Sequence, residues 1–229
     1  MKIGKPTLKR NPKAELCKRD TGMIDTIVFH HTATSPNQTI TNINNYQLTQ
    51  GGDDPWLMIA YHFTISGAYP GEKTPAANIQ AGRPVEIIGS HTGKGTYATP
   101  SAEATKVIKD NPPTCGKEGG KFVLDKKLYG PDGRSRANAS TIGVVIIGNY
   151  APYSSKNETG YKKNKPRYPT EDMLIQAAKL SCEIQRQYPS VKFIKWHDFY
   201  KPTGCPGTVE QKIPRIVELT KGYGCDFSS

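Results

Sequence analysis

Short apolar runs alternate along the chain with segments of helical period. Runs rich in Ile, Val and Phe, bounded by polar or Gly-containing segments, are typical of β-strands. They predict five strands, over residues 24–29, 59–65, 85–88, 141–147 and 191–195. Residues 141–147 are apolar on both faces, which is typical of a central strand of a sheet.

Residues 171–188 carry the clearest helix signals. Thr170 is a favourable N-cap, and Glu171 and Asp172 place carboxylates at the positive end of the helix dipole. Pro189 ends the helix. One face of the predicted helix consists of Leu174, Ala177, Ala178, Ser181, Ile184 and Tyr188.

Two further helices have weaker signals. The first is predicted over residues 36–50, with Ser35 or Asn37 as its cap and with Ile40, Ile43 and Tyr46 on one face. The second lies within residues 208–221. Thr208 and Gln211 resemble a capping box, whereas Pro214 would place the start of the regular helix later.

Strands that alternate with helices indicate an α/β fold, a single domain with a central mixed β-sheet flanked by helices. The 229 residues suffice for one such domain with one or two insertions. We predict a basic N-terminal arm over residues 1–22, a domain over 23–221 and a tail over 222–229. Residues 92–140, rich in Gly, Pro, Lys and Asn and without a sustained period, are interpreted as a loop insertion.

The formal net charge of +11 predicts an anionic partner, either nucleic acid or a bacterial envelope, and charge alone does not choose between them. The arm holds seven basic residues and is either a solvated tail or an envelope-binding segment. No run reaches the about 18 apolar residues of a membrane span. The first residues lack the apolar core of a classical signal peptide, so we expect another export route or a start in a cytosol.

The cysteines do not have the spacing of a disulfide scaffold. They are few, odd in number and widely spaced, at Cys17, Cys115, Cys182, Cys205 and Cys225. A bridge between Cys17 and Cys225 would join the two ends of the chain, although spacing alone does not define which cysteines approach each other.

Candidate metal ligands gather at two strand ends. His197 follows the last predicted strand, and Cys205 lies eight residues later, before a Pro-Gly pair. Imidazole and thiolate are ligands that Zn²⁺ prefers, and His30 at the end of the first strand is well placed as a third. Three protein ligands leave a fourth position open, as in catalytic zinc sites. The alternative is that each is an ordinary buried residue.

Four segments resemble the amidase-2 superfamily, which includes phage amidase endolysins and peptidoglycan-recognition proteins. The matching segments are residues 27–34, 59–65, 141–149 and 197–207, in the order of the family. The resemblance implies that His30, His197 and Cys205 bind zinc and that Tyr61 is catalytic. It also implies hydrolysis of the amide bond between N-acetylmuramic acid and L-alanine in peptidoglycan, on the bacterial cell wall.

Two positions distinguish branches of this family. Thr203 lies two residues before the cysteine ligand, where some phage members have lysine and catalytic recognition proteins have threonine. Val145 lies where other branches have a general-base glutamate. The chain is therefore similar to the tyrosine-dependent branch, in which Tyr61 would hydrogen-bond the developing oxyanion or the water on zinc.

The remaining candidates are less specific. His31 and His62 alternate in direction with His30 and Tyr61 and are expected in the core. His91 follows a strand end and is predicted to line the substrate cleft. The other predicted substrate contacts are Thr32, Asn149 and Trp56, the last of which would stack on sugar or peptide or simply anchor a loop.

Three other functions are compatible with parts of the sequence. A peptidoglycan receptor without hydrolytic activity would lack the cysteine ligand, so the presence of Cys205 argues against this function. A nucleic-acid-binding protein with structural zinc would need four closely spaced ligands, which are absent from the sequence. An amidase for other acyl-amino bonds stays open. We expect a monomer without a nucleic-acid partner, released by a phage-type route or exported non-classically.

Overall fold

A five-stranded mixed sheet forms the centre of the computed structural model, which describes residues 2–50, 56–67, 77–92, 96–117, 123–124, 135–151 and 167–229. The strand order is β10-β2-β9-β3-β4. The strands are β2 (Thr26–His31), β3 (Phe63–Ser66), β4 (Asn78–Ala81), β9 (Thr141–Ile146) and β10 (Phe193–Trp196). Only β4 is antiparallel to its neighbour. The predicted α/β fold with a central mixed sheet is confirmed.

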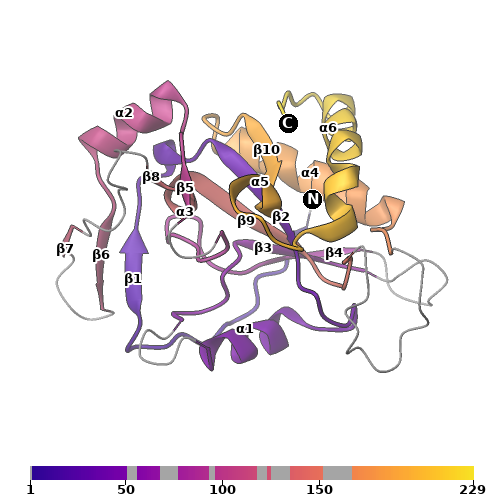
Figure 1. Cartoon of the computed structure of the whole chain (residues 1–229), viewed down its shortest axis with the longest axis horizontal. Helices are drawn as coiled ribbons and strands as arrows, with labels where there is room; N and C mark the ends of the chain where they lie inside the picture. Colours follow the sequence, from indigo (N-terminus) through magenta and orange to yellow (C-terminus); the bar gives the residue numbers. More distant parts are fainter. Residues whose placement is uncertain are drawn as a thin grey trace.

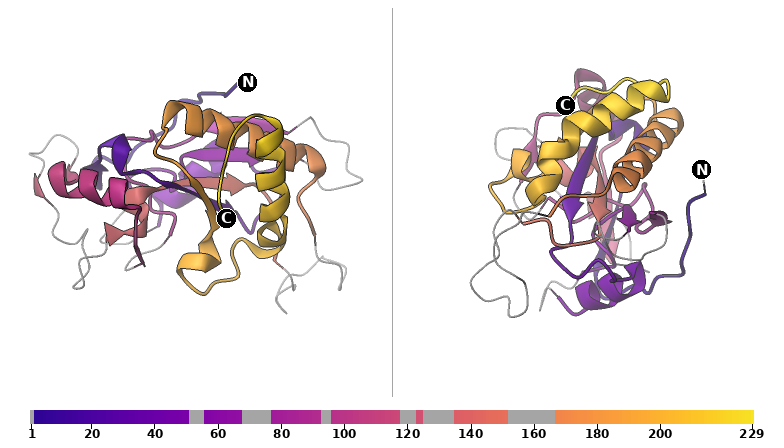
Figure 2. Two further views of the ribbon diagram at one scale, coloured as in Figure 1. Left: turned by 90° about the horizontal axis from the view of Figure 1, so that it is seen from above. Right: turned by 90° about the vertical axis from the view of Figure 1, so that its right-hand side faces the viewer.

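Helices cover both faces of this sheet (Figures 1 and 2). Helices α4 (Glu171–Gln187) and α6 (Ile213–Gly222) pack on each other and on one face, while α1 (Ile40–Leu48) covers the other. Strands β2 and β9 are buried along their whole length, so the predicted central strand is confirmed. Among the described residues, no helix is long and apolar enough to cross a membrane.

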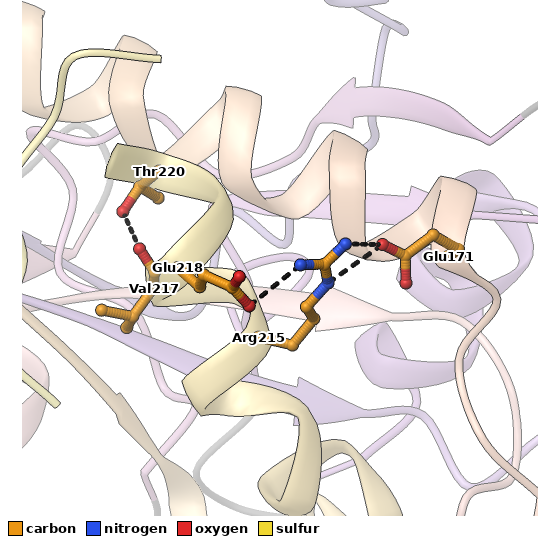
Figure 3. A network of polar contacts seen from close by, with 5 residues as sticks. All are labelled: Glu171, Arg215, Val217, Glu218 and Thr220. Carbon is orange, nitrogen blue, oxygen red and sulfur yellow. Dashed lines mark hydrogen bonds and ion pairs between the residues drawn. The ribbon is translucent and has the colours of Figure 1, made fainter. Parts of the chain in front are cut away.

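Helix α4 begins and ends where the sequence predicts. The Thr170 hydroxyl accepts a hydrogen bond from the backbone N–H of Met173, and the first turn carries Glu171 and Asp172. Arg215 of α6 bonds Glu171 at 2.7 Å and Glu218 at 2.9 Å (Figure 3). The Glu171 pair joins α6 to α4, whereas the Glu218 pair lies within α6, and because these side chains are exposed both pairs contribute little to stability.

Helix α1 differs from its prediction in its start and its buried face, and helix α6 follows one of the two starts predicted for it. Helix α1 begins at Ile40 because Thr39, rather than Ser35 or Asn37, caps it by accepting from the Asn42 N–H. Ile40 and Ile43 are buried, but Tyr46, predicted on the same face, is 67% exposed. Asn44 is buried there instead. The chain before α6 is a 3₁₀ turn, η3 (Gly207–Lys212), and Pro214 lies in the first turn of α6, as the second alternative expects.

Two predicted strands are also corrected. Residues 59–62 are irregular because side chains of α1 take their backbone N–H groups: the Asn44 carbonyl binds the Ile59 N–H at 2.7 Å, and Gln47 binds that of Ala60 at 2.8 Å. Residues 85–88 form only a single bridge, between Ile87 and Lys18. Strand β4 was not predicted.

The predicted loop insertion contains regular structure. Its elements are β5 (Tyr97–Ala98), α2 (Ala102–Asp110), β6 (Thr114–Lys117), β7 (Val123–Leu124), β8 (Ser135–Arg136) and α3 (Ala137–Ser140). Helix α2 packs on the 3₁₀ turn η1 (Thr21–Met23), and the Asp25 carboxylate accepts from the Ser101 N–H at 2.6 Å. The insertion is therefore attached to the start of β2.

The N-terminal segment is not a free arm. Strand β1 (Glu15–Lys18) pairs with β6, and the Gly4 N–H donates to the carbonyl of Ile79 in β4. The cysteines pair as Cys17–Cys115 and Cys182–Cys225, which corrects the suggested Cys17–Cys225 bridge. The error arose because the pairing of β1 with β6, which opposes Cys17 and Cys115, has no local sequence signal.

Arg19 joins this segment to the core. It is 6% exposed and donates to four backbone carbonyls at 2.8–3.0 Å, those of Val85, Asn138, Ala139 and Thr141. Burial lowers the pKa of its guanidinium to about 9. The cation is therefore stabilised by carbonyl dipoles, and no carboxylate is among its hydrogen-bond partners in the described residues.

Replacement of Arg19 by leucine should lower the free energy of unfolding by about 3 kcal/mol or more, because each buried carbonyl left without a donor costs about 1–3 kcal/mol. Urea unfolding followed by circular dichroism measures the change. Arg186→Leu is the matched control, since Arg186 is exposed and bonds one carbonyl, that of Tyr223. Equal effects of the two substitutions would contradict the assigned role of Arg19.

Candidate metal centre

The three predicted ligands meet at one edge of the sheet. His30 lies near the end of β2, and His197 follows β10, which pairs in parallel with β2. The register places Trp196 opposite Phe29. The residues that follow these two, His197 and His30, therefore also lie side by side. Their ring centroids are 4.7 Å apart.

Cys205 is brought back to this edge by a short loop. After the helical turn α5 (His197–Tyr200), the Asp198 carboxylate accepts from the Thr203 N–H at 2.7 Å. The Cys205 sulfur lies 3.7 Å from Nδ1 of His30 and accepts from the His31 N–H at 3.4 Å. One ligand atom from each of His30, His197 and Cys205 lies within 4.8 Å of the others.

The donor atoms have the protonation chemistry of a zinc site. Burial lowers the pKa of His30 and of His197, so both imidazoles are neutral at pH 7 and each keeps a lone pair. The Nε2 atom of His197 is buried and has no hydrogen-bond partner among the described residues. Burial raises the pKa of the Cys205 thiol to about 12, so only a cation beside it would stabilise the thiolate. Two nitrogens and one sulfur fit Zn²⁺.

Tyr61 lies beside this group of donors. It precedes β3, and its ring centroid is 5.2 Å from that of His30. Burial raises the phenol pKa above its usual value, and a thiolate at Cys205 raises it further. Tyr61 therefore stays protonated at neutral pH and can donate a hydrogen bond.

Thr203 is held by its own loop. Its hydroxyl accepts from the Cys205 N–H at 3.4 Å, and the side chain is exposed. Its catalytic role stays a prediction. Sequence reasoning missed Asp198, which orders the loop between two ligands. The available signal was an Asp directly after a candidate ligand in a turn-rich segment, since Asp side chains commonly bind nearby backbone N–H groups.

The predicted substrate contacts have different surroundings. The Thr32 hydroxyl accepts from the Gly148 N–H at 2.9 Å and so joins the ends of β2 and β9. Asn149 follows Gly148, and its side-chain amide oxygen accepts a hydrogen bond from the Ala151 N–H at 3.1 Å. Trp56 is half-buried. These three roles stay predictions.

The remaining histidines are core residues with bonded nitrogens. His31 accepts from the Tyr150 N–H at 2.9 Å, and His62 accepts from the Gly143 N–H at 3.0 Å, as expected for packed residues. His91 is only 4% exposed, and one of its nitrogens lies 3.0 Å from Nε2 of His30. The prediction that His91 lines the cleft does not fit this burial.

Acid should destabilise the metal-free protein. Burial lowers the pKa of His30, His31, His62 and His91, that of His31 to about 4. The unfolded chain, with histidine pKa values near about 6.5, therefore binds more protons between pH 6.5 and 4, and stability falls as pH falls through this window. His31 alone should contribute about 3 kcal/mol.

Urea unfolding of the zinc-free protein at pH 8, 6 and 4.5 measures this loss. His31→Asn, which keeps an acceptor for the Tyr150 N–H, should be less sensitive to pH than the wild-type protein. Stability that is constant across these pH values would show that the buried imidazoles take up protons as readily in the folded state as in the unfolded chain, which would contradict their lowered pKa values.

Comparison with known families agrees with this architecture. The model of the Amidase_2 family, described as N-acetylmuramoyl-L-alanine amidase, matches residues 20–208. The matched segment includes His30, Tyr61, His197 and Cys205. The chain therefore belongs to this amidase family. A search of curated proteins found no sequence match.

Solved structures show the same fold. The amidase LysC from Clostridium intestinale has a TM-score of 0.56 at 20% identity, over 96% of this chain and 98% of that chain. The Ph2119 endolysin from a Thermus scotoductus bacteriophage gives 0.51 at 14%, over 93% and 92%. The bumblebee peptidoglycan-recognition protein PGRP-SA gives 0.52 at 16%, over 93% of each chain. At these identities the likeness concerns the fold.

Proposed function

We propose that this protein is a zinc-dependent amidase that hydrolyses the bond between N-acetylmuramic acid and L-alanine in peptidoglycan. The observation that carries the proposal is the convergence of His30, His197 and Cys205, whose ligand atoms lie within 4.8 Å of one another. The family match supports the substrate class. These three side chains would hold the ion, and three protein ligands are typical of zinc sites that act on a substrate.

The ion and the phenol have separate tasks in this proposal. Bound zinc supplies Lewis acidity, which polarises an amide carbonyl and makes water a stronger acid. Tyr61 remains protonated because burial raises its pKa, so its hydroxyl donates to the oxygen on which negative charge develops. Asp198 holds the Thr203 backbone, and the Thr203 hydroxyl, which is exposed, is the group that we propose to orient substrate.

The charge of the chain suits an anionic wall. The surplus of 31 basic over 20 acidic residues, a formal net charge of +11, would concentrate the protein at teichoic acids or stem-peptide carboxylates. Two disulfides support action outside a reducing cytosol, because such bonds persist in oxidising compartments. Thr32, Asn149 and Trp56 are the substrate contacts that we propose around the metal centre.

Digestion of purified peptidoglycan with product analysis by mass spectrometry tests the function. The expected products are stem peptides with free L-alanine amino termini and glycan strands of unchanged length. A sample treated with a zinc chelator serves as the control and should show no release until zinc is returned. New reducing sugars, cuts within the stem peptide, or binding without any product would each contradict the proposal.

A further inference from the structure

His91 is buried next to the predicted metal ligand His30. Its ring lies against the backbone of β9, so closely that a Cβ atom on Gly143 would be 2.5 Å from the ring. A Cβ on Gly89 would be 2.7 Å from the same ring. Two glycines thus make room for an imidazole that is 4% exposed, and only specific polar partners can satisfy its nitrogens there.

A directed chain of hydrogen bonds passes through this ring. The Thr141 hydroxyl donates to the Ala137 carbonyl at 2.6 Å, so its oxygen must accept from Nε2 of His91, 3.2 Å away. A neutral imidazole carries one proton, so Nδ1 of His91 is then an acceptor. The Nε2 atom of His30 lies 3.0 Å from it and is therefore the donor.

The direction of these hydrogen bonds decides which ring nitrogen of His30 carries no proton. With its proton on Nε2, His30 presents the Nδ1 lone pair, and this is the atom that lies 3.7 Å from the Cys205 sulfur. The other tautomer would place a proton on Nδ1, in the position of the metal. An outer hydrogen bond of this kind commonly sets the tautomer of a metal ligand.

Thr92, the residue after His91, contacts the second histidine ligand, His197. His197 is hydrogen-bonded to the backbone of Thr92, while its Nε2 is without a partner among the described residues. The Thr92 carbonyl also accepts from the Thr96 hydroxyl at 2.7 Å, and the Thr92 N–H is bound by Asn138 at 3.0 Å. Two consecutive residues therefore orient both histidine ligands.

We infer that His91, held in one tautomer by Thr141, is a positioning residue that keeps Nδ1 of His30 unprotonated and aimed at the metal. The inference rests on the metal centre of the proposed function. It assigns His91 to metal affinity rather than to the substrate cleft.

The tautomer can be measured without any metal. In metal-free wild-type protein labelled with ¹⁵N-histidine, NMR should show His30 with its proton on Nε2 and His91 likewise. A proton on Nδ1 of His30 would overturn the inference. Because the measurement needs neither zinc nor substrate, it stands even if the protein binds no zinc, an outcome that would instead defeat the proposed function.

Zinc affinity provides the second readout. Competition with a chromophoric chelator should show that His91→Phe weakens zinc binding by about 10- to 100-fold, the usual range for loss of an outer hydrogen bond. His62→Phe is the matched control: its ring is 5.7 Å from that of His91, and its nitrogens contact the Gly143 N–H, the Ile87 carbonyl and the Arg19 guanidinium rather than a zinc ligand, so zinc affinity should be unchanged. Equal affinities of the two variants would overturn the inference.

Milder substitutions guard against loss of the fold. Thr141→Val removes the acceptor of His91 and should weaken zinc binding by about tenfold, whereas Thr141→Ser keeps the hydroxyl and should bind like the wild type. His91→Asn offers an amide oxygen to His30 and should recover most of the affinity that His91→Phe loses. If Thr141→Val and Thr141→Ser bind zinc equally, Thr141 does not set the tautomer.

Discussion

Replacement of Cys205 by serine is expected to remove zinc and amidase activity together. The sulfur is 3.7 Å from Nδ1 of His30 and is the only thiol of the centre. A neutral hydroxyl is a poor zinc ligand, so affinity should fall by more than the about 10- to 100-fold caused by losing an outer hydrogen bond. Metal analysis and peptidoglycan digestion measure the two losses.

The control for this substitution removes two other cysteines. A double serine variant at Cys182 and Cys225 loses the disulfide between α4 and the C-terminal segment but keeps all three ligands. It should be less stable, yet bind one zinc ion per chain. A Cys205→Ser protein that retains a full complement of zinc and full activity would show that the sulfur is not a ligand.

Replacement of Tyr61 by phenylalanine is expected to keep zinc and to reduce turnover by about 10²- to 10³-fold. The ring remains beside His30, so the metal centre keeps its packing. The lost hydroxyl acts as charge develops in the reaction, so kcat should fall with little change in KM. Steady-state kinetics on a soluble muramyl peptide, with zinc content measured in parallel, separates the two effects.

Tyr46→Phe is the control, because that phenol is 67% exposed on α1 and should be dispensable. Full activity of Tyr61→Phe would remove Tyr61 from the mechanism and leave polarisation by the metal alone. Loss of zinc in Tyr61→Phe would instead indicate that the phenol supports the fold of the centre.

Elements with strong local signals were predicted well. Helix α4 has its cap, first-turn carboxylates and apolar face within one continuous segment, and strand β9 is a continuous apolar run. His30 lies near the end of β2 and His197 directly follows β10, and parallel strands of one sheet end at the same edge, so their proximity follows from topology. Local sequence is sufficient where the stabilising contacts are themselves local.

Predictions failed where distant residues decide the backbone. Residues 59–62 are apolar enough for a strand, but side chains of α1 bind two of their N–H groups, Asn44 that of Ile59 and Gln47 that of Ala60. The Cys17–Cys115 bridge depends on pairing between segments 98 residues apart. No local propensity encodes either contact, because each exists only after the chain has folded.

The sequence by itself determined the type of chemistry: two imidazoles and a thiolate at strand ends, with a tyrosine nearby in the second strand segment. Only the tertiary structure decided how these groups are prepared for a metal. The tautomer of His30 depends on His91 and Thr141, which lie 61 and 111 residues further along the chain. A tautomer is set by the hydrogen bond at the opposite ring nitrogen, and that partner is defined by packing in three dimensions.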